Sequence, residues 1–206
     1  MGDLVDVRGL VRRFGDREVI RGLDLKLRAG GRTALVGPNG SGKTTLLRCI
    51  AGTLTPNSGE VRIDGERAGT LAARRLVGTS LSQERSFYLR LSGRTNLLFF
   101  ARLRHTRARD ARREVAELEE ELELSEIASR RADACSTGML QQLAFARALL
   151  GRPSVVLLDE PTRSLDEQAT GRIWAALDRR PDIAVLIATH LDDDLDRCDS
   201  RVDFPH

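Results

Sequence analysis

Residues 37–44 read Gly37-Pro38-Asn39-Gly40-Ser41-Gly42-Lys43-Thr44 and match the pattern G-x-x-x-x-G-K-[ST] of phosphate-binding loops. Residues 33–37, just before this pattern, form a short β-like run, and residues 45–51 have a helical pattern. In that context, backbone N–H groups and a helix N-terminus can surround a phosphate. The alternative is a glycine-rich turn that precedes Lys-Thr by chance, and the flanking pattern disfavours it. The stretch therefore predicts the P-loop of a nucleotide-binding core.

Each part of this loop has an expected role. Lys43 would place a compact positive charge at the β- and γ-phosphates, and the Thr44 hydroxyl would hold Mg²⁺. Lys26 and Lys43 are the only lysines of a chain that otherwise uses arginine, which is consistent with a site that requires an ammonium group. The nucleotide contacts predicted from this stretch are Gly37, Pro38, Asn39, Gly40, Ser41, Gly42, Lys43, Thr44 and Thr45.

The composition favours a soluble globular protein. The 206 residues are enough for one domain with a small insertion, and no apolar stretch reaches the roughly 18 residues that a membrane span needs. The three cysteines are widely spaced, which fits neither a disulfide framework nor a zinc site and favours a reducing cytosol. The N-terminus is acidic and lacks a signal-peptide core. The net charge of +3 comes from dispersed arginines, so we expect a solvated surface rather than a nucleic-acid face.

The order of apolar patterns predicts an α/β fold. Residues 4–28 alternate as in antiparallel strands, whereas residues 84–134 carry helical patterns at 94–104 and 109–124. Further strands are expected at residues 60–64, 76–81, 154–158 and 183–188, and further helices at 136–150, 168–178 and 191–198. We therefore predict one domain over residues 1–206: a P-loop core with a doubly wound, mostly parallel sheet, an N-terminal antiparallel subdomain and a helical insertion at about 84–134.

Acidic residues follow the most apolar strand. The run at 155–158 leads into Asp159 and Glu160, and ligands of open α/β sheets bind at the carboxyl ends of the strands. Asp159 would hold Mg²⁺ through water, and Glu160 would polarise an attacking water as a general base. His190 follows another strand, at the place where the γ-phosphate is expected.

With these motifs in this order, nearly the whole chain resembles the nucleotide-binding subunits of ATP-binding-cassette transporters. The resemblance gives Gln83 the role of sensing Mg²⁺ and the attacking water, and it makes His190 the switch histidine. Asp166, in the run 161–166, matches the loop that crosses a dimer interface. Phe14 falls where the family places an aromatic that stacks on adenine, although a core position for Phe14 is the alternative.

The signature segment departs from the family's usual LSGGQ. Residues 135–142 read Cys-Ser-Thr-Gly-Met-Leu-Gln-Gln, so Ser136 and Gly138 are kept while Thr137 and Met139 differ. Similar forms occur in export-type members of the family. The resemblance implies that Ser136 and Gly138 meet the γ-phosphate bound to a facing copy, where a helix N-terminus favours negative charge.

The resemblance implies an ATPase that uses ATP and Mg²⁺ and powers a separately encoded membrane-spanning subunit, in the export direction. Two copies, or one copy with a homologous subunit, would enclose two ATP molecules at the cytoplasmic face of the membrane. Phe87, Tyr88 and Leu89 would lie near the membrane subunit, the alternative being an ordinary surface. Two rivals remain: a cassette ATPase that acts on nucleic acid or ribosomes, and a small-molecule P-loop kinase. We expect no nucleic-acid partner.

Overall fold

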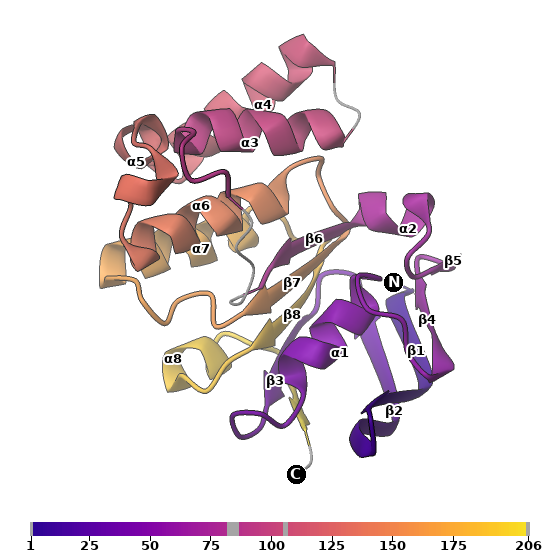
Figure 1. Ribbon diagram of the computed structural model, residues 1–206. Helices are drawn as coiled ribbons and strands as arrows, with labels where there is room; N and C mark the ends of the chain where they lie inside the picture. The colour runs from indigo at the N-terminus through magenta and orange to yellow at the C-terminus, as the bar shows by residue number, and fades with distance from the viewer. Residues whose placement is uncertain (1, 82–86, 105–106, 205–206) are drawn as a thin grey trace.

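The computed structural model describes residues 2–81, 87–104 and 107–204. Figure 1 shows that the strands form two sheets, which are surrounded by helices. In chain order the elements are β1 Asp3–Phe14, β2 Arg17–Arg28, β3 Arg32–Val36, α1 Lys43–Ile50, β4 Ser58–Ile63, β5 Glu66–Arg67, α2 Leu71–Leu76, β6 Val77–Ser80, α3 Gly93–Leu103, α4 Ala108–Glu121, α5 Ser125–Ser129, the 3₁₀ turn η1 Ala132–Ala134, α6 Thr137–Leu149, β7 Val155–Asp159, α7 Glu167–Asp178, β8 Ala184–Ala188, α8 Asp192–Leu195 and β9 Ser200–Asp203.

The N-terminal sheet is antiparallel, with the strand order β2-β1-β4-β5. Its first two strands form a hairpin that reverses at Gly15, whose φ of 56° lies in the region that glycine adopts at little cost. Val5 and Val7 of β1 are buried, whereas the residues on either side of Val7 are more exposed. This alternation leaves one apolar face for packing against the rest of the molecule.

The second sheet has the order β6-β7-β8-β3-β9, and its strands pair in parallel. All residues of β7 and β8 are buried, as is typical of strands covered on both faces. Val155 and Leu157 belong to one apolar cluster, whereas Val156 and Leu158 belong to the other. Because side chains alternate along a strand, the two clusters lie on opposite faces of this sheet.

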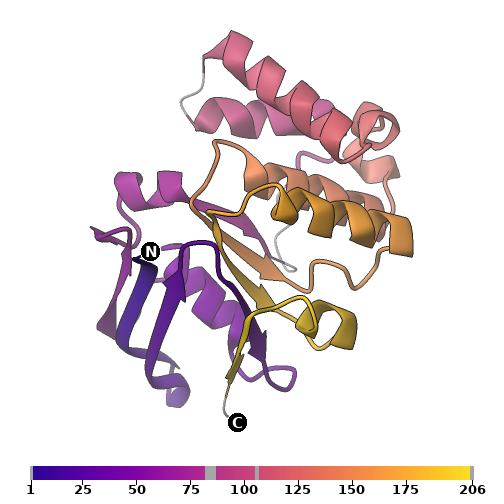
Figure 2. The same ribbon diagram turned by 180° about the vertical axis from the view of Figure 1, so that it is seen from behind.

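Different elements cover the two faces. Helix α1 lies between the parallel and antiparallel sheets, and its Leu46, Leu47 and Ile50 are fully buried there (Figure 1). Helices α6 and α7 lie on the other side, with α3, α4 and α5 beyond them (Figures 1 and 2). Within the described residues, no helix combines the length and the apolar character that crossing a membrane requires.

The predicted fold class is confirmed: the chain combines a parallel α/β sheet with an N-terminal antiparallel sheet. Each strand and helix expected from the patterns is present, although the last helix is shorter than residues 191–198 and covers Asp192–Leu195. The elements β5, α2, α5, η1 and β9 were not predicted. Each has six residues or fewer, so its sequence offers too little periodicity to recognise.

Candidate nucleotide-binding site

The P-loop connects β3 to α1, and its glycines are needed for close packing. Gly42 caps the N-terminus of α1 with a φ of 115°. A Cβ on Gly42 would lie 2.5 Å from Cγ1 of Val19 and 3.1 Å from Cε1 of Phe204. A Cβ on Gly37 would lie 2.9 Å from the carbonyl oxygen of Phe204. The loop is therefore held between β2 and the segment after β9, a support that the sequence patterns did not reveal.

Two P-loop side chains have defined partners. The Nζ of Lys43 donates to the carbonyl oxygens of Gly37, at 2.7 Å, and of Pro38, at 3.0 Å, so the ammonium lies inside the curve of the loop. The Oγ1 of Thr44 donates to Oδ2 of Asp159 at 2.7 Å. This contact joins the start of α1 to the carboxyl end of β7, two strands away from β3 in the sheet.

The Thr44 hydroxyl and the Asp159 carboxylate are ligands of the kind that Mg²⁺ prefers. In the part of the chain that the structure describes, no three His, Cys, Asp or Glu side chains form a group that could hold a metal. Mg²⁺ usually binds through one or two protein oxygens and takes its other ligands from water and phosphates. The pair therefore fits an Mg²⁺ ion that arrives with a nucleotide.

Glu160 has a strained backbone and a precise side-chain position. Its φ of 51° is left-handed, which costs a non-glycine residue about 1–3 kcal/mol. Its N–H donates to the carbonyl oxygen of Ala188 at 2.8 Å, and its Oε1 lies 2.7 Å from Nδ1 of His190. Its Oε2 is buried, with no hydrogen-bond partner among the described residues. The structure thus brings the predicted base and the predicted switch histidine together and leaves one carboxylate oxygen unused.

Gln141 is a site residue that the sequence patterns did not identify. It lies on α6, and its Nε2 donates to the backbone carbonyl oxygen of Glu160. The signature segment is therefore connected to the loop after β7 within one chain. Its position inside residues 135–142 was the only signal, and a periodicity argument cannot tell which glutamine of this segment turns inward.

Ser136, Gly138 and Asp166 have structural roles in their own chain. Ser136 caps α6, with its Oγ accepting from the N–H of Met139 at 3.2 Å. A Cβ on Gly138 would lie 2.5 Å from the carbonyl oxygen of Ser164, so α6 packs closely on the loop after β7. Asp166 caps α7, with its Oδ1 accepting from the N–H of Ala169 at 2.7 Å. Both caps leave the termini of these helices at the surface, since Ser136 and Asp166 are exposed.

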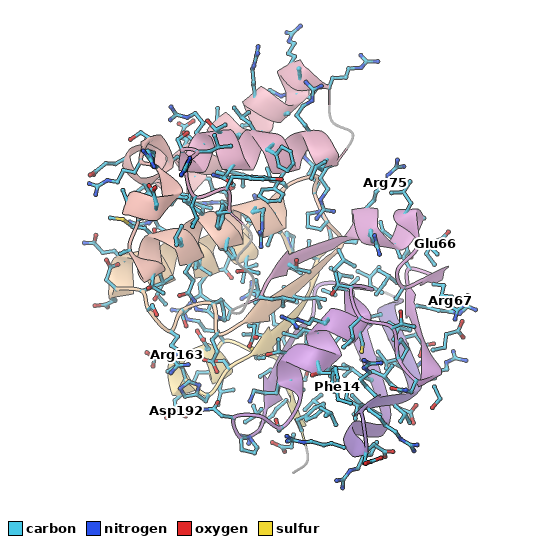
Figure 3. All side chains as sticks on the ribbon, in the orientation of Figure 1. Phe14, Glu66, Arg67, Arg75, Arg163 and Asp192 are labelled. Carbon is cyan, nitrogen blue, oxygen red and sulfur yellow. The ribbon has the colours of Figure 1, made fainter. Side chains whose placement is uncertain are left out.

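The proposed base-stacking residue is exposed. Phe14, labelled in Figure 3, lies at the end of β1 with 49% of its surface accessible, and the Arg12 guanidinium lies 4.5 Å from the ring centroid. A cavity of about 480 Å³ opens between β2 and the P-loop residues Gly40 and Ser41. Phe14 is therefore not a core residue, which removes the alternative interpretation. Gln83 lies outside the described residues.

The aromatic segment before α3 is divided between interior and surface. Phe87 packs edge-on against Phe100, with ring centroids 6.3 Å apart, and the Arg147 guanidinium lies 5.3 Å from its ring. Tyr88 and Leu89 are 51% and 57% exposed. Of the three residues predicted near a membrane subunit, Tyr88 and Leu89 are at the surface and Phe87 is largely a packing residue.

A larger cavity, of about 650 Å³, lies between α4 and the end of α7. Its lining includes Ile183, which precedes β8, and so it lies at the amino ends of the parallel strands, away from the P-loop. Three of its charged groups bind one another: Glu121 accepts hydrogen bonds from Arg180 and Arg179. The smaller cavity beside Gly40 is therefore the better candidate for a nucleotide.

Comparisons with known proteins identify the family. Residues 20–163 match the ABC transporter family. A Nod factor export ATP-binding protein I from Burkholderia orbicola (strain AU 1054) is 37% identical over 202 residues, covering 95% of this chain and 66% of that protein. A spermidine/putrescine import ATP-binding protein PotA from Chromobacterium violaceum is 34% identical over 163 residues, covering 79% of this chain and 45% of that protein.

The fold has solved counterparts. One described as the structure of an ATP binding subunit of an ABC transporter superposes with a TM-score of 0.88 at 25% identity, covering 98% of this chain and 85% of that one. The chain spans about half to two thirds of the length of the curated relatives named above. The chain therefore belongs to the ABC transporter family, and its fold is that of the family's ATP-binding ATPase subunits.

Proposed function

We propose that this chain hydrolyses ATP to drive a separately encoded membrane transporter, and that the transporter exports its cargo. The observation that carries the proposal is the arrangement at the carboxyl edge of the parallel sheet. There, the Thr44 hydroxyl meets Asp159, and the next residue, Glu160, meets His190. The groups that would bind phosphate, bind the metal and activate water are thus neighbours at one edge of the parallel sheet.

Binding begins with the P-loop. Its backbone N–H groups and the N-terminus of α1 hold the phosphates, and the Lys43 ammonium exchanges its two backbone carbonyls for phosphate oxygens. Thr44 and Asp159 would hold Mg²⁺, which would supply positive charge against the phosphates when bound. The cavity beside Gly40 and Ser41 offers space for the nucleoside, and the exposed ring of Phe14 is free to stack on a base.

Hydrolysis then depends on Glu160. Its Oε1 lies 2.7 Å from Nδ1 of His190, so the carboxylate that would accept a proton from water is oriented by the histidine. Because the carboxylate is positioned before the reaction, little energy is spent on ordering it in the transition state. Catalysis in this scheme is mainly positioning and charge stabilisation of the transferred phosphoryl group.

The proposed assembly has two copies of this chain, or this chain and a homologous subunit. The exposed N-terminus of α6, with Ser136 at its cap, would face the γ-phosphate of the opposite copy. Tyr88 and Leu89 would contact the membrane subunit, and the chain would act at the cytoplasmic face of the membrane. The proposal of export is supported by the Ser-Thr-Gly-Met form of the signature, and the similarity to a Nod factor export protein is compatible with it.

The test of the proposed activity is the variant Glu160→Gln. We expect Mg²⁺-dependent phosphate release from ATP by the natural chain and about 10²–10⁴-fold slower release by the variant, because a general base contributes that much. ATP affinity should stay the same, since Glu160 does not hold the phosphates. Glu167→Gln, an exposed change at the start of α7, is the matched control. Near-natural turnover in Glu160→Gln would remove Glu160 from this role.

A further inference from the structure

A buried carboxylate contacts the two loops that carry Glu160 and His190 and has no part in the scheme above. Asp194, on the short helix α8, is 1% exposed. Its Oδ2 accepts hydrogen bonds from Oγ1 of Thr162, at 2.7 Å, and from Oγ1 of Thr189, at 2.9 Å. Both threonines are also buried. A buried carboxylate is costly unless it is well bonded, so its presence calls for a physical reason.

The two threonines come from the two loops that carry the pair. Thr162 lies two residues after Glu160, in the loop that follows β7, and Thr189 directly precedes His190, in the loop that follows β8. The Asp194 carboxylate therefore joins these loops through one oxygen atom. Figure 3 labels Arg163, in the loop after β7, and Asp192, the first residue of α8, close to one another in that view.

Further contacts make this connection stiff. Oγ1 of Thr189 also accepts from the N–H of Leu191 at 3.1 Å, which fixes the backbone on both sides of His190. In the other loop, the N–H of Leu165 donates to the carbonyl oxygen of Thr162 at 3.0 Å. Ser164, in the same turn, is the residue on which Gly138 of α6 packs.

We infer that Asp194 is a positioning residue for hydrolysis: through Thr162 and Thr189 it sets the distance between Glu160 and His190. The sheet fixes the backbone of Glu160, whose N–H donates to Ala188 at the end of β8, but His190 lies two residues beyond that strand, so the sheet alone does not determine this distance. A displacement of about 1 Å in a catalytic group can lower a rate on the order of 10²-fold. This inference rests on the proposed function, since it concerns the turnover of ATP.

The test uses two variants of similar size. Asp194→Leu leaves the two buried hydroxyl groups with no acceptor for their protons, whereas Asp194→Asn keeps a carbonyl oxygen that accepts from both and puts its amide nitrogen where the buried Oδ1 has no partner among the described residues. We expect Asp194→Leu to lower kcat by about 10- to 100-fold, with the Kd for ATP changed by less than about twofold. Asp194→Asn, which keeps both of these hydrogen bonds, should retain clearly more of kcat than Asp194→Leu. Asp193→Leu, an exposed position on the same helix, is the control and should behave as the natural chain.

A double-mutant cycle separates positioning from general loss of structure. In a His190→Ala background the distance to His190 no longer matters, so Asp194→Leu should lower the residual turnover by less than about twofold. An equal loss in both backgrounds would overturn the inference, as would natural kcat in Asp194→Leu. If Asp194→Leu does not fold, Thr162→Val, which removes a single hydrogen bond, takes its place. An equal loss in both backgrounds, or natural kcat in Thr162→Val, would then overturn the inference. Absence of hydrolysis by the natural chain would instead contradict the proposed function.

Discussion

At the scale of single residues, Lys43 is the group whose position is most closely tied to its chemistry. Two backbone carbonyls hold its ammonium inside the P-loop, and a planar guanidinium has a different shape and different donor directions. We expect Lys43→Ala to weaken ATP binding by about tenfold or more, the loss of roughly one charge-assisted hydrogen bond, and to abolish hydrolysis. Lys43→Arg should also impair both. Titration with a fluorescent ATP analogue and phosphate release measure these effects.

Lys26 provides the matched control because it is the only other lysine. It is exposed on β2 and binds Asp3 at 2.8 Å. Lys26→Arg should leave ATP affinity and turnover unchanged. Full activity in Lys43→Arg would contradict the argument that the loop requires a compact ammonium.

Gly138 and Ser136 show why a variant must be chosen from the structure. The Cβ of an Asp introduced at Gly138 would lie 2.5 Å from the carbonyl oxygen of Ser164 in the same chain. Any loss of dimer could therefore result from local misfolding. At Ser136, Asp and Asn both make good helix caps, and only Asp adds a charge. Ser136 is therefore the position at which charge can be tested with little effect on the fold.

At the scale of elements, we expect variants in the segment before α3 to affect either assembly with the membrane subunit or stability, but not both. The double variant Tyr88→Ala/Leu89→Ala changes exposed side chains, so we expect the Tm and the basal ATPase rate to stay close to those of the natural chain. Association of the tagged chain with membranes of its host should fall, as measured by fractionation. Phe87→Ala should instead lower stability by about 1–3 kcal/mol, because it removes packing against Phe100.

Leu71 is a suitable control for that experiment. It is 62% exposed on α2, and Leu71→Ala should affect neither stability nor membrane association. Unchanged membrane association of the Tyr88→Ala/Leu89→Ala protein would show that this patch is not where the partner binds.

A second element-scale prediction concerns the connection between α4 and α7. Hydrogen bonds from Arg180 hold the pKa of the Glu121 carboxyl below its usual value, against the opposing effect of burial. Arg180 binds both carboxylate oxygens at 2.7 Å. We expect Glu121→Gln to lower the free energy of unfolding at pH 7 by about 1 kcal/mol, allowing for the partial exposure of the pair.

The sign of the pH effect follows from the lowered pKa. The stabilisation is complete above the pKa of Glu121 in the unfolded chain, about 4.3, and is lost as the pH falls through the lower folded value. The difference in the free energy of unfolding between the natural chain and Glu121→Gln should thus be constant between about pH 7 and pH 5.5. It should shrink in more acidic solution. Urea unfolding at several pH values measures it, with the exposed Glu120→Gln as control. A difference that grows on acidification would contradict this assignment.

At the scale of the whole molecule, the sequence predicts the groups that are local to one strand end. The P-loop and the Asp159–Glu160 pair follow apolar strands directly, so pattern and topology together place them at one edge. The bond from Gln141 to Glu160, the support of Gly42 by Phe204 and the bridge at Asp194 join residues distant in the chain. No local periodicity encodes such contacts, which is why they became visible only in the fold.

Dimer formation is the prediction that belongs to this scale. The P-loop lies at the N-terminus of α1 and Ser136 at the N-terminus of α6, helices that cover opposite faces of the parallel sheet. In the proposed assembly they complete each other's sites in a head-to-tail pair. ATP should therefore convert Glu160→Gln protein from monomer to dimer, as measured by size-exclusion chromatography with light scattering. With ADP the protein should remain mostly monomeric.

Ser136 tests whether the two copies share their sites. Ser136→Asp adds a carboxylate that would face the γ-phosphate of the opposite copy, so it should prevent the dimer and the turnover while each monomer still binds ATP. Ser136→Asn, which is neutral and equally able to cap α6, should keep both the ATP-dependent dimer and the turnover. When inactive Lys43→Ala and Ser136→Asp chains are mixed, a mixed dimer has one site with both changes and one site with neither. Turnover should then return, and two inactive chains that never complement one another would refute the shared-site arrangement.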